Sequence, residues 1–240
     1  MHERGNGGAR FRPATSPLIL GFGPSLRITD PRNGSVVRRR SFVAGVHDSY
    51  VVTESPPYQH GIEVRLTPLG GYSLLRVPMH TLANRAVALE DVLGPEASTL
   101  ADHLVSLPDW EARFDRLDGV LLRALGEGRA PSPTGAWAWQ RLEESSGRVP
   151  IGALAGELGC TRKHVAQRFR DEVGVSPKTL ARVLRFNRAV HLLRDRGIGL
   201  ADIALRCGYS DQAHFNRDFR EFAGLAPGAF ALRTPVTADM

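Results

Sequence analysis

The sequence has few of the residues that cross-link a chain covalently or anchor it in a membrane. It contains two cysteines in 240 residues, too few for a disulfide framework, so a reducing compartment is the simpler expectation. The longest apolar run, Leu18–Phe22, is far shorter than the roughly 20 residues that span a bilayer. No apolar segment follows the basic N-terminus, so no secretory signal is expected. We therefore expect a cytoplasmic protein without a membrane partner.

Signatures of catalysis are also missing. The sequence has no P-loop, no G-x-S-x-G nucleophile elbow and no dinucleotide-binding fingerprint. Its N-terminal histidines, His47, His60 and His80, are scattered and form no H-x-H or H-x-E pair. The expectation is that the protein is not an enzyme and has no cofactor, no metal site and no catalytic residues.

What the sequence does contain is an ordinary globular composition with an uneven distribution of charge. Hydrophobic residues make up 42% and charged residues 23%, which excludes a fibrous or mostly disordered chain. The formal net charge is +6, and a stretch rich in Pro, Gly and Ser covers residues 126–135. Before residue 134 there are 15 Lys and Arg against 14 Asp and Glu; after it there are 16 against 11. A basic C-terminal part favours a polyanion such as nucleic acid, although a solvated surface has a similar charge balance.

Short apolar runs alternate with turn residues between Pro17 and Pro78. Runs of this length with β-branched members, bounded by Pro, Gly and Asn, are typical of strands. The expected strands are Leu18–Phe22, Val36–Val37, Ser41–Val46, Ser49–Val52, Ile62–Leu66 and Tyr72–Val77. Their spacing predicts a small antiparallel barrel or sandwich.

From Thr81 onward the apolar period becomes helical. Helices are expected at Leu89–Leu93, Glu96–Leu107 and Trp110–Leu125. The third carries one apolar stripe at steps of three and four residues, formed by Trp110, Phe114, Leu117, Leu121 and Leu125. We expect this stripe to be part of the core or one half of a dimer seam.

After residue 136 every segment has a helical pattern. The expected helices are Trp137–Ser146, Ile151–Leu158, Arg162–Val173, Pro177–Arg196, Leu200–Cys207 and Asp211–Phe222. Three of them have a hydroxyl residue in position to cap the N-terminus, namely Thr161, Ser176 and Ser210. Gly174 and Gly224 follow the ends of two helices, and Trp137 and Trp139 are expected to pack the first helix onto the domain.

Two segments within this helical part repeat one another. Each has an apolar residue followed by Ala, then a Gly, and later a Phe, a second Gly and a Pro. The first Gly recurs at a distance of 49 residues (Gly159 and Gly208), and the later Phe at 50 (Phe169 and Phe219). One extra residue in the second copy explains the difference. Each copy predicts a short helix, a tight turn and a capped second helix, which is a helix-turn-helix. The second helix is the element that enters the major groove in such units.

The repeat resembles the DNA-binding region of AraC/XylS-type transcription regulators. The resemblance covers residues 137–234 and rests on GCTRKHVAQRFRDEVGVSP (159–177), LRFNRAVHLLRD (184–195) and LADIALRCGYSDQAHFNRDFREFAGLAPGAF (200–230). It implies two helix-turn-helix units bridged by a rigid helix, with recognition helices in major-groove segments about one turn, or ~10 bp, apart. It also implies a sensor or oligomerisation domain in front, often a cupin-like barrel followed by helices. Residues 42–52 and 89–94 also resemble a divergent sensor class of this family.

Helical periodicity places Val165, Phe169, Phe215 and Phe219 inward and leaves an outward face on each recognition helix. Within the resemblance, base readout is expected from Lys163, Ala166, Gln167, Gln212, Ala213, Asn216 and Arg217. Contacts to phosphates are expected from Arg162, Arg168, Arg170, His214 and Arg220. Arg217 suits bidentate bonding to guanine, and Gln212 or Asn216 suits adenine. Gln167 stands where the family often has Arg, and Lys163 also suits a phosphate.

The expected architecture is α+β, with a β-rich sensor part and trailing helices before an all-α part of two helix-turn-helix units. The expected divisions are a flexible tail (1–16), a sensor or oligomerisation domain (17–125), a linker (126–136) and a DNA-binding domain (137–234). The expected function is sequence-specific regulation of transcription, with promoter DNA and RNA polymerase as partners. A small-molecule effector and a homodimer are left open, as are activation or repression and the operator sequence. Two alternatives stand beside it: a metal-dependent cupin-type enzyme with a helical tether, and a nonspecific nucleoid-binding protein.

Overall fold

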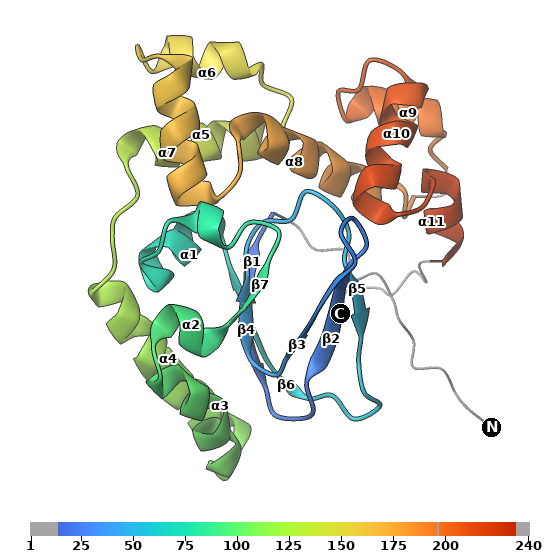
Figure 1. The fold of residues 1–240 in the computed structure, drawn as a ribbon. Helices are drawn as coiled ribbons and strands as arrows, with labels where there is room; N and C mark the ends of the chain where they lie inside the picture. Colours follow the sequence, from blue (N-terminus) through green and yellow to red (C-terminus); the bar gives the residue numbers. More distant parts are fainter. Residues whose placement is uncertain (1–13, 196, 234–240) are drawn as a thin grey trace, which may run out of the picture.

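The structure is a computed structural model that describes residues 14–195 and 197–233. Most of the expected tail and the last residue of the expected DNA-binding domain lie outside the described residues. Strands dominate the N-terminal half and helices the C-terminal half, and the helical half lies over one end of the sheets (Figure 1). This is the β-rich plus all-α arrangement that the sequence predicts.

The described strands form two antiparallel sheets. Their bounds are β1 Ser16–Gly21, β2 Leu26–Asp30, β3 Ser35–Arg39, β4 Phe42–Ala44, β5 Val52–Glu54, β6 Gly61–Leu66 and β7 Ala86–Ala88. One sheet has the order β6-β1-β4-β7 and the other the order β3-β2-β5. In the first, Leu18 of β1 lies opposite Val43 of β4 on one side and Val64 of β6 on the other.

The larger sheet is covered on both faces because its side chains alternate. Leu18 and Leu20 pack into a core shared with α-helices of the N-terminal half. Ile19, between them, packs instead with Ile28 and Phe42 on the side that faces the second sheet. A period of two therefore divides β1 between a helix-covered face and a sheet-covered face.

The segment Tyr72–Val77, expected as a strand, is helical as far as Leu75. Helix α1 (Pro68–Leu75) begins at Thr67, whose hydroxyl accepts a hydrogen bond from the Gly70 N–H at 3.0 Å. Pro68 follows in the first turn, where its missing N–H costs no helical hydrogen bond. Pro is a turn signal in many sequences, but Thr-Pro is also a helix start.

Other N-terminal expectations need smaller corrections. The segment Ser49–Val52 enters a strand only at Val52, and β2 and β7 were not expected. The tail does not extend to residue 16, because Ser16 already belongs to β1 and Ala14 is buried in the core of the helical half.

Three further helices cover the larger sheet: α2 (Leu89–Leu93), α3 (Glu96–Ser106) and α4 (Trp110–Gly126). They lie where the period predicts helices, but the stripe on α4 is only partly core. Leu117 is 3% exposed, whereas Trp110, Phe114 and Leu125 are 45–49% exposed. Trp110 stacks between Phe22 and Phe114, so this end of α4 carries a half-exposed aromatic cluster.

The helical half consists of α5 (Pro133–Glu144), α6 (Ile151–Glu157), α7 (Arg162–Val173), α8 (Pro177–Leu192), α9 (Leu200–Arg206), α10 (Gln212–Ala223) and α11 (Pro227–Arg233). Helix α5 begins within the expected linker, because Ser132 caps it and Pro133 occupies its first turn. Helix α8 was expected to reach residue 196 but ends at Leu192. After this end, the Asp195 N–H bonds back to the Leu192 carbonyl at 3.1 Å. Trp139 is buried in the common core and Trp137 packs against it, as expected.

The two halves contact each other at the C-terminal ends of both expected recognition helices. α7 packs against α1 and the 3-10 turn η1 (Met79–Thr81), as Figure 1 shows for α1. A Cβ atom at Gly174, the residue after α7, would lie 2.9 Å from the Met79 carbonyl oxygen. At the equivalent Gly224, after α10, it would lie 2.8 Å from the Tyr50 ring. Both glycines are needed for close approach as well as for their left-handed backbone.

Candidate nucleic-acid interface

The repeat in the sequence is a repeat of backbone geometry. α6–α7 and α9–α10 are each a short helix, a turn and a longer helix. In the first unit the Cys160 N–H bonds to the Ala155 carbonyl at 3.2 Å, and in the second the Tyr209 N–H bonds to Ala204 at 3.0 Å. These are the long bonds of a Schellman motif, whose left-handed position is filled by Gly159 (φ +61°) and Gly208 (φ +79°).

The N-caps show where the extra residue of the second copy lies. Thr161 accepts the His164 N–H at 3.2 Å and caps α7, and Ser176 caps α8, as expected. α10 is capped by Asp211, which accepts the His214 N–H at 2.6 Å, and not by the expected Ser210. This bond, more than the others, holds the pKa of Asp211 below its usual value. Thr161 and Asp211 are 50 residues apart, so the extra residue lies in the turn.

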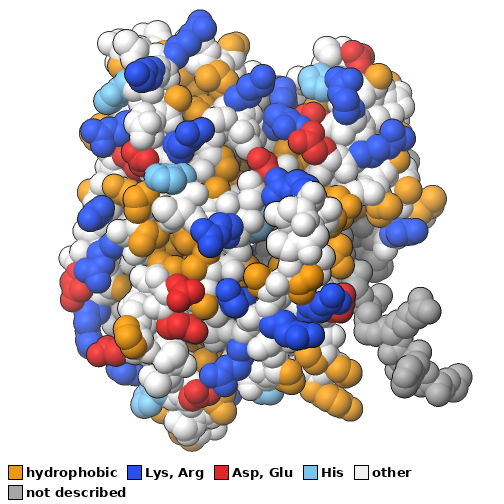
Figure 2. Space-filling model, in the orientation of Figure 1, with side chains coloured by type: hydrophobic (Ala, Val, Ile, Leu, Met, Phe, Trp, Pro, Cys, Tyr) orange, Lys and Arg blue, Asp and Glu red, His pale blue; other side chains and the backbone are white. Residues whose placement is uncertain are grey.

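The recognition helices bury the predicted faces. Val165, Phe169, Phe215 and Phe219 are each at most 3% exposed. Of the residues expected to read bases, Lys163, Ala166, Gln167, Gln212, Ala213 and Arg217 are exposed and Asn216 is half-buried. Of those expected to contact phosphates, Arg162, Arg168, Arg170 and Arg220 are exposed and His214 is half-buried. Lys and Arg side chains are spread over the part of the surface that covers these helices (Figure 2).

Two of these residues, Gln167 and His214, make side-chain contacts within the protein, and a third, Asn216, is half-buried. The Gln167 amide donates to the Asp171 carboxylate at 3.1 Å, one turn further along α7. The Asn216 carbonyl oxygen is buried, with no hydrogen-bond partner among the described residues. His214 packs edge-on against the Tyr209 ring, and its Nδ1 lies 3.1 Å from the Ser210 hydroxyl. These contacts do not test a role at DNA, so the twelve assignments stay predictions.

An ion-pair network, in which Asp218 is buried and Glu221 is exposed, fixes α10 on the linker helix α8. Arg182 donates to Asp218 at 3.0 Å and to Glu221 at 2.6 Å, and its guanidinium lies 5.1 Å from the centre of the Phe222 ring. Burial alone would lower the pKa of Arg182, but the two carboxylates outweigh it and raise the pKa. The sequence analysis missed this network. A signal was available, since Asp218 precedes the buried Phe219 on the inner side of α10 and needs a cationic partner there.

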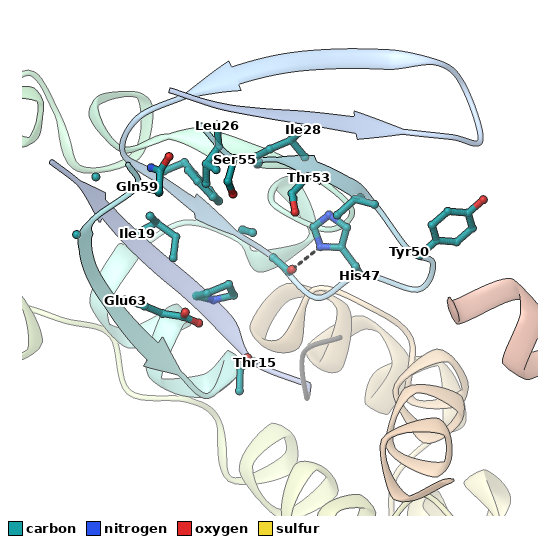
Figure 3. A pocket seen from close by; sticks show the side chains of 18 of the residues that line it. Thr15, Ile19, Leu26, Ile28, His47, Tyr50, Thr53, Ser55, Gln59 and Glu63 are labelled. Atoms are coloured by element: carbon teal, nitrogen blue, oxygen red, sulfur yellow. Dashed lines mark hydrogen bonds between the residues drawn. The ribbon is translucent and has the colours of Figure 1, made fainter. Parts of the chain in front are cut away.

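A cavity of about 530 Å³ lies between the two sheets. Ile19, Ile28, His47 and Glu63 line it from the strands and loops, as Figure 3 shows. Val183 and Phe186 of α8 and Phe222 of α10 close it from the helical half. These three residues have the sequence pattern of ordinary helical core, so their place in a cavity wall could not be predicted.

His47, His60 and His80 are not gathered into one site. His47 and His60 line the cavity, while the His80 Nδ1 lies 3.4 Å from Asp171 of α7. The described residues include no group of three or more His, Cys, Asp and Glu side chains that could hold a metal ion. Within the same residues, no helix is both long and apolar enough to span a bilayer.

Comparisons with known proteins match the helical half. A family model described as "Helix-turn-helix domain" matches residues 154–233. The HTH-type transcriptional activator RhaS of Escherichia coli O139:H28 (strain E24377A / ETEC) is 33% identical over 75 residues, which are 31% of this chain and 27% of RhaS. The chain thus matches about a quarter of the length of this relative.

One solved structure is similar over nearly the whole chain. The similarity to ToxT from Vibrio cholerae O395 covers 95% of this chain and 93% of the ToxT chain. The TM-score is 0.52 and the sequence identity is 11%. The C-terminal domain of AraT, a response regulator from Geobacillus stearothermophilus, covers 47% of this chain at 22% identity and a TM-score of 0.41. Residues 154–233 thus match a helix-turn-helix domain, and the likeness to ToxT extends the shared fold to the β-rich half.

Proposed function

We propose that the protein is a sequence-specific regulator of transcription that binds double-stranded DNA through α7 and α10. The observation that carries this proposal is the duplicated turn geometry, in which two identical Schellman turns each lead into a capped helix with an exposed polar face. α8 joins the two units, and the Arg182 network fixes the second on it. Rigidly joined helices of this kind suit two successive major-groove segments on one face of DNA.

The residue assignments divide specificity from affinity. Arg217 is exposed on α10 and is proposed to take guanine O6 and N7, with Gln212 beside it for adenine. On α7, Lys163 is the leading candidate, because the Gln167 amide must first leave Asp171 to reach a base. The phosphate contacts proposed for Arg162, Arg168, Arg170 and Arg220 set affinity and its dependence on salt.

The remaining parts of the proposal concern the N-terminal half. We treat residues 17–125 as a sensor or oligomerisation part and move the start of the DNA-binding part from residue 137 to Pro133, where α5 begins. The cavity is the proposed place for an effector, and the half-exposed aromatic end of α4 the proposed place for a second copy. A promoter-bound regulator would act on RNA polymerase in the cytoplasm, without chemistry of its own.

The proposal is tested by selecting binding sites from a random DNA library with the full-length protein at about 150 mM salt, close to physiological ionic strength. We expect two short conserved blocks whose centres lie about 10 bp apart. Arg217→Ala should lower the discrimination between bases in one block by roughly 1–3 kcal/mol. The base preference in the other block should not change. Arg123→Ala, which removes an exposed Arg of α4, is the matched control and should leave both blocks unchanged.

An outcome without any enriched motif would contradict the proposal. If binding then also disappears with modest added salt, the protein is a nonspecific polyanion binder, because counterion release alone gives that behaviour.

A further inference from the structure

We propose that Asp171 of α7 is a positioning residue, and that the N-terminal half sets through His80 how firmly Asp171 holds Gln167 back from a base. The inference rests on the proposed function in one respect, since it takes Gln167 as a residue that reads DNA. It gives the contact between the two halves a role in specificity, because the state of Asp171 then decides which bases the first unit prefers.

The Asp171 carboxylate is shared between two side chains. The Gln167 amide nitrogen donates to it and lies 3.3 Å from Oδ1 and 3.1 Å from Oδ2. The Nδ1 of His80 lies 3.4 Å from Oδ1, the same oxygen. Residues four apart on a helix face one another, so the first contact is local to α7, whereas the second comes from the other half of the molecule. Because both neighbours use the charge of one carboxylate, a stronger attraction to His80 leaves less for Gln167.

His80 is held beside α7 by the packing of the turn that carries it. The preceding residue, Met79, is 1% exposed, and a Cβ atom at Gly174 would lie 2.9 Å from its carbonyl oxygen. The hydroxyl of the following residue, Thr81, donates to the Pro78 carbonyl at 2.7 Å. The His80 side chain itself is 44% exposed. Its contact with α7 therefore lies at the edge of the interface, where it can change while the interface stays packed.

The second unit has a carboxylate at the same position but a different partner for it. Fifty positions later, Arg217 and Glu221 take the places of Gln167 and Asp171. Glu221 accepts from Arg182 of α8 at 2.6 Å, so its partner belongs to the helical half. In the first unit the corresponding partner lies across the contact with the N-terminal half. The first unit is therefore the one whose base preference the N-terminal half can change.

The size of the effect follows from the exposed position of these contacts. A Gln–Asp hydrogen bond at a spacing of four residues contributes little to a helix, and its loss corresponds to a change of about twofold in an equilibrium constant. A Gln side chain suits adenine, to which it makes two hydrogen bonds. Release of Gln167 should therefore raise the preference for adenine at one position of the block that α7 reads by about twofold.

The test compares Asp171→Ala with Asp171→Asn. Both variants remove the same charge near DNA, which should raise the affinity for all sequences alike. Only Asp171→Ala removes the acceptor, because the amide oxygen of an Asn side chain still accepts from the Gln167 amide. Binding of the full-length protein is titrated with operators that differ at single base pairs of the α7 block, the block that Arg217→Ala leaves unchanged. We expect the adenine preference to rise about twofold in Asp171→Ala and to keep its wild-type value in Asp171→Asn. In a Gln167→Ala background, Asp171→Ala should change no preference.

Two variants of His80 test the contribution of the N-terminal half. His80→Arg places a permanent cation beside Asp171 and should raise the adenine preference, whereas His80→Ala leaves Asp171 to Gln167 alone and should lower it. The matched control is Glu144→Ala on α5, which removes the acceptor of a contact of the same kind, from Gln140 at 2.8 Å. This variant should leave the preference unchanged. Circular dichroism and thermal unfolding establish that the variants fold.

An adenine preference that is the same in the wild-type protein and in Asp171→Ala would overturn the inference. Equal rises in Asp171→Ala and Asp171→Asn would also overturn it, because the loss of charge alone explains them. Changes of the same sign in His80→Arg and His80→Ala would refute the role of the N-terminal half. In each of these cases the two blocks selected by the wild-type protein remain, so the proposed function stands. A library that yields no motif refutes the proposed function, and the inference fails with it.

Discussion

The two helix-turn-helix units have the same internal design but are held in place differently. Each turn begins with a left-handed Gly, and each second helix buries a pair of residues spaced by four. α7 lies against the N-terminal half, where Asp171 faces His80 and α1 packs beside it. α10 is fixed to α8 by the three charges of the Arg182 network. The repeat therefore encodes the shape of a unit, whereas contacts made by residues outside the repeated pattern position each unit in the molecule.

The largest effect is expected from removing the support of the second unit. Arg182→Met leaves Asp218, whose side chain is 7% exposed, as an unpaired buried charge. We expect a loss of about 3 kcal/mol in the free energy of unfolding, measured with urea. Arg182→Met combined with Asp218→Leu should regain most of that loss, because no buried charge is then left alone.

The surface pair of Arg27 and Glu54 provides the control for this experiment. Both side chains are more than 40% exposed, so Arg27→Met should cost less than about 1 kcal/mol. Equal losses for Arg182→Met and Arg27→Met would mean that the network does not hold α10.

The next effect compares Gly174 and Gly224, which follow the two recognition helices, with Gly159, which lies in the turn of the first unit. The Cβ atom added by Gly159→Ala would have no atom within 4 Å. This variant should therefore lose only the stability that a left-handed backbone costs a residue with a side chain, about 1–2 kcal/mol. Gly174→Ala should cost about 1–3 kcal/mol more, because its Cβ atom would press on the backbone of Met79. Gly224→Ala should lie between them, since the Tyr50 side chain can move. Thermal unfolding of the three variants checks this order, and the same loss in all three would show that the halves are not in contact there.

The caps differ in charge, so they should differ in their response to pH. Thr161→Ala should cost about 1 kcal/mol at every pH. The pKa of Asp211 is lowered in the folded protein, so its contribution is present above the ordinary value of 3.8 and lost as the pH falls below it. Asp211→Asn should remove this part of the acid destabilisation. Urea unfolding between neutral and acid pH tests it, and an unchanged pH profile in Asp211→Asn would contradict the cap assignment.

The smallest effect concerns His47. Burial lowers the pKa of His47, so the unfolded chain binds a proton more readily than the folded one below about 6.5. Stability should fall as the pH decreases through that value, and His47→Gln should flatten this step. Among the described lining residues of the cavity, α8 and α10 contribute and α7 does not. Hydrogen exchange at about pH 5.5 should therefore increase in α10 more than in α7, and the reverse order would argue against coupling through the cavity.

Local signals in the sequence predicted much of the helical half. Caps such as Thr161 and Ser176, the left-handed glycines and the inward phenylalanines all act within one turn, and the structure has them as expected. Errors arose where two local signals compete. Ser210 and Asp211 are both good caps, and the carboxylate is the one that takes the bond. Thr67-Pro68 starts a helix as readily as a turn.

Long-range features could not be predicted in this way. The Arg182 network joins residues 36 and 39 positions apart, and the cavity draws its wall from both halves of the chain. Neither leaves a periodic pattern in the sequence. The short strands β2 and β7 depend in the same manner on partners that lie far along the chain.

The most direct test of the account measures affinity for the selected operator as the distance between its two blocks is varied. The fixed connection of the two units through α8 predicts that inserting five base pairs, about half a turn, reduces affinity to that of a single block. It also predicts that inserting ten does not restore it, because the helix cannot lengthen. Affinity that is unchanged by five base pairs, or fully restored by ten, would contradict the claim that one rigid domain reads both segments.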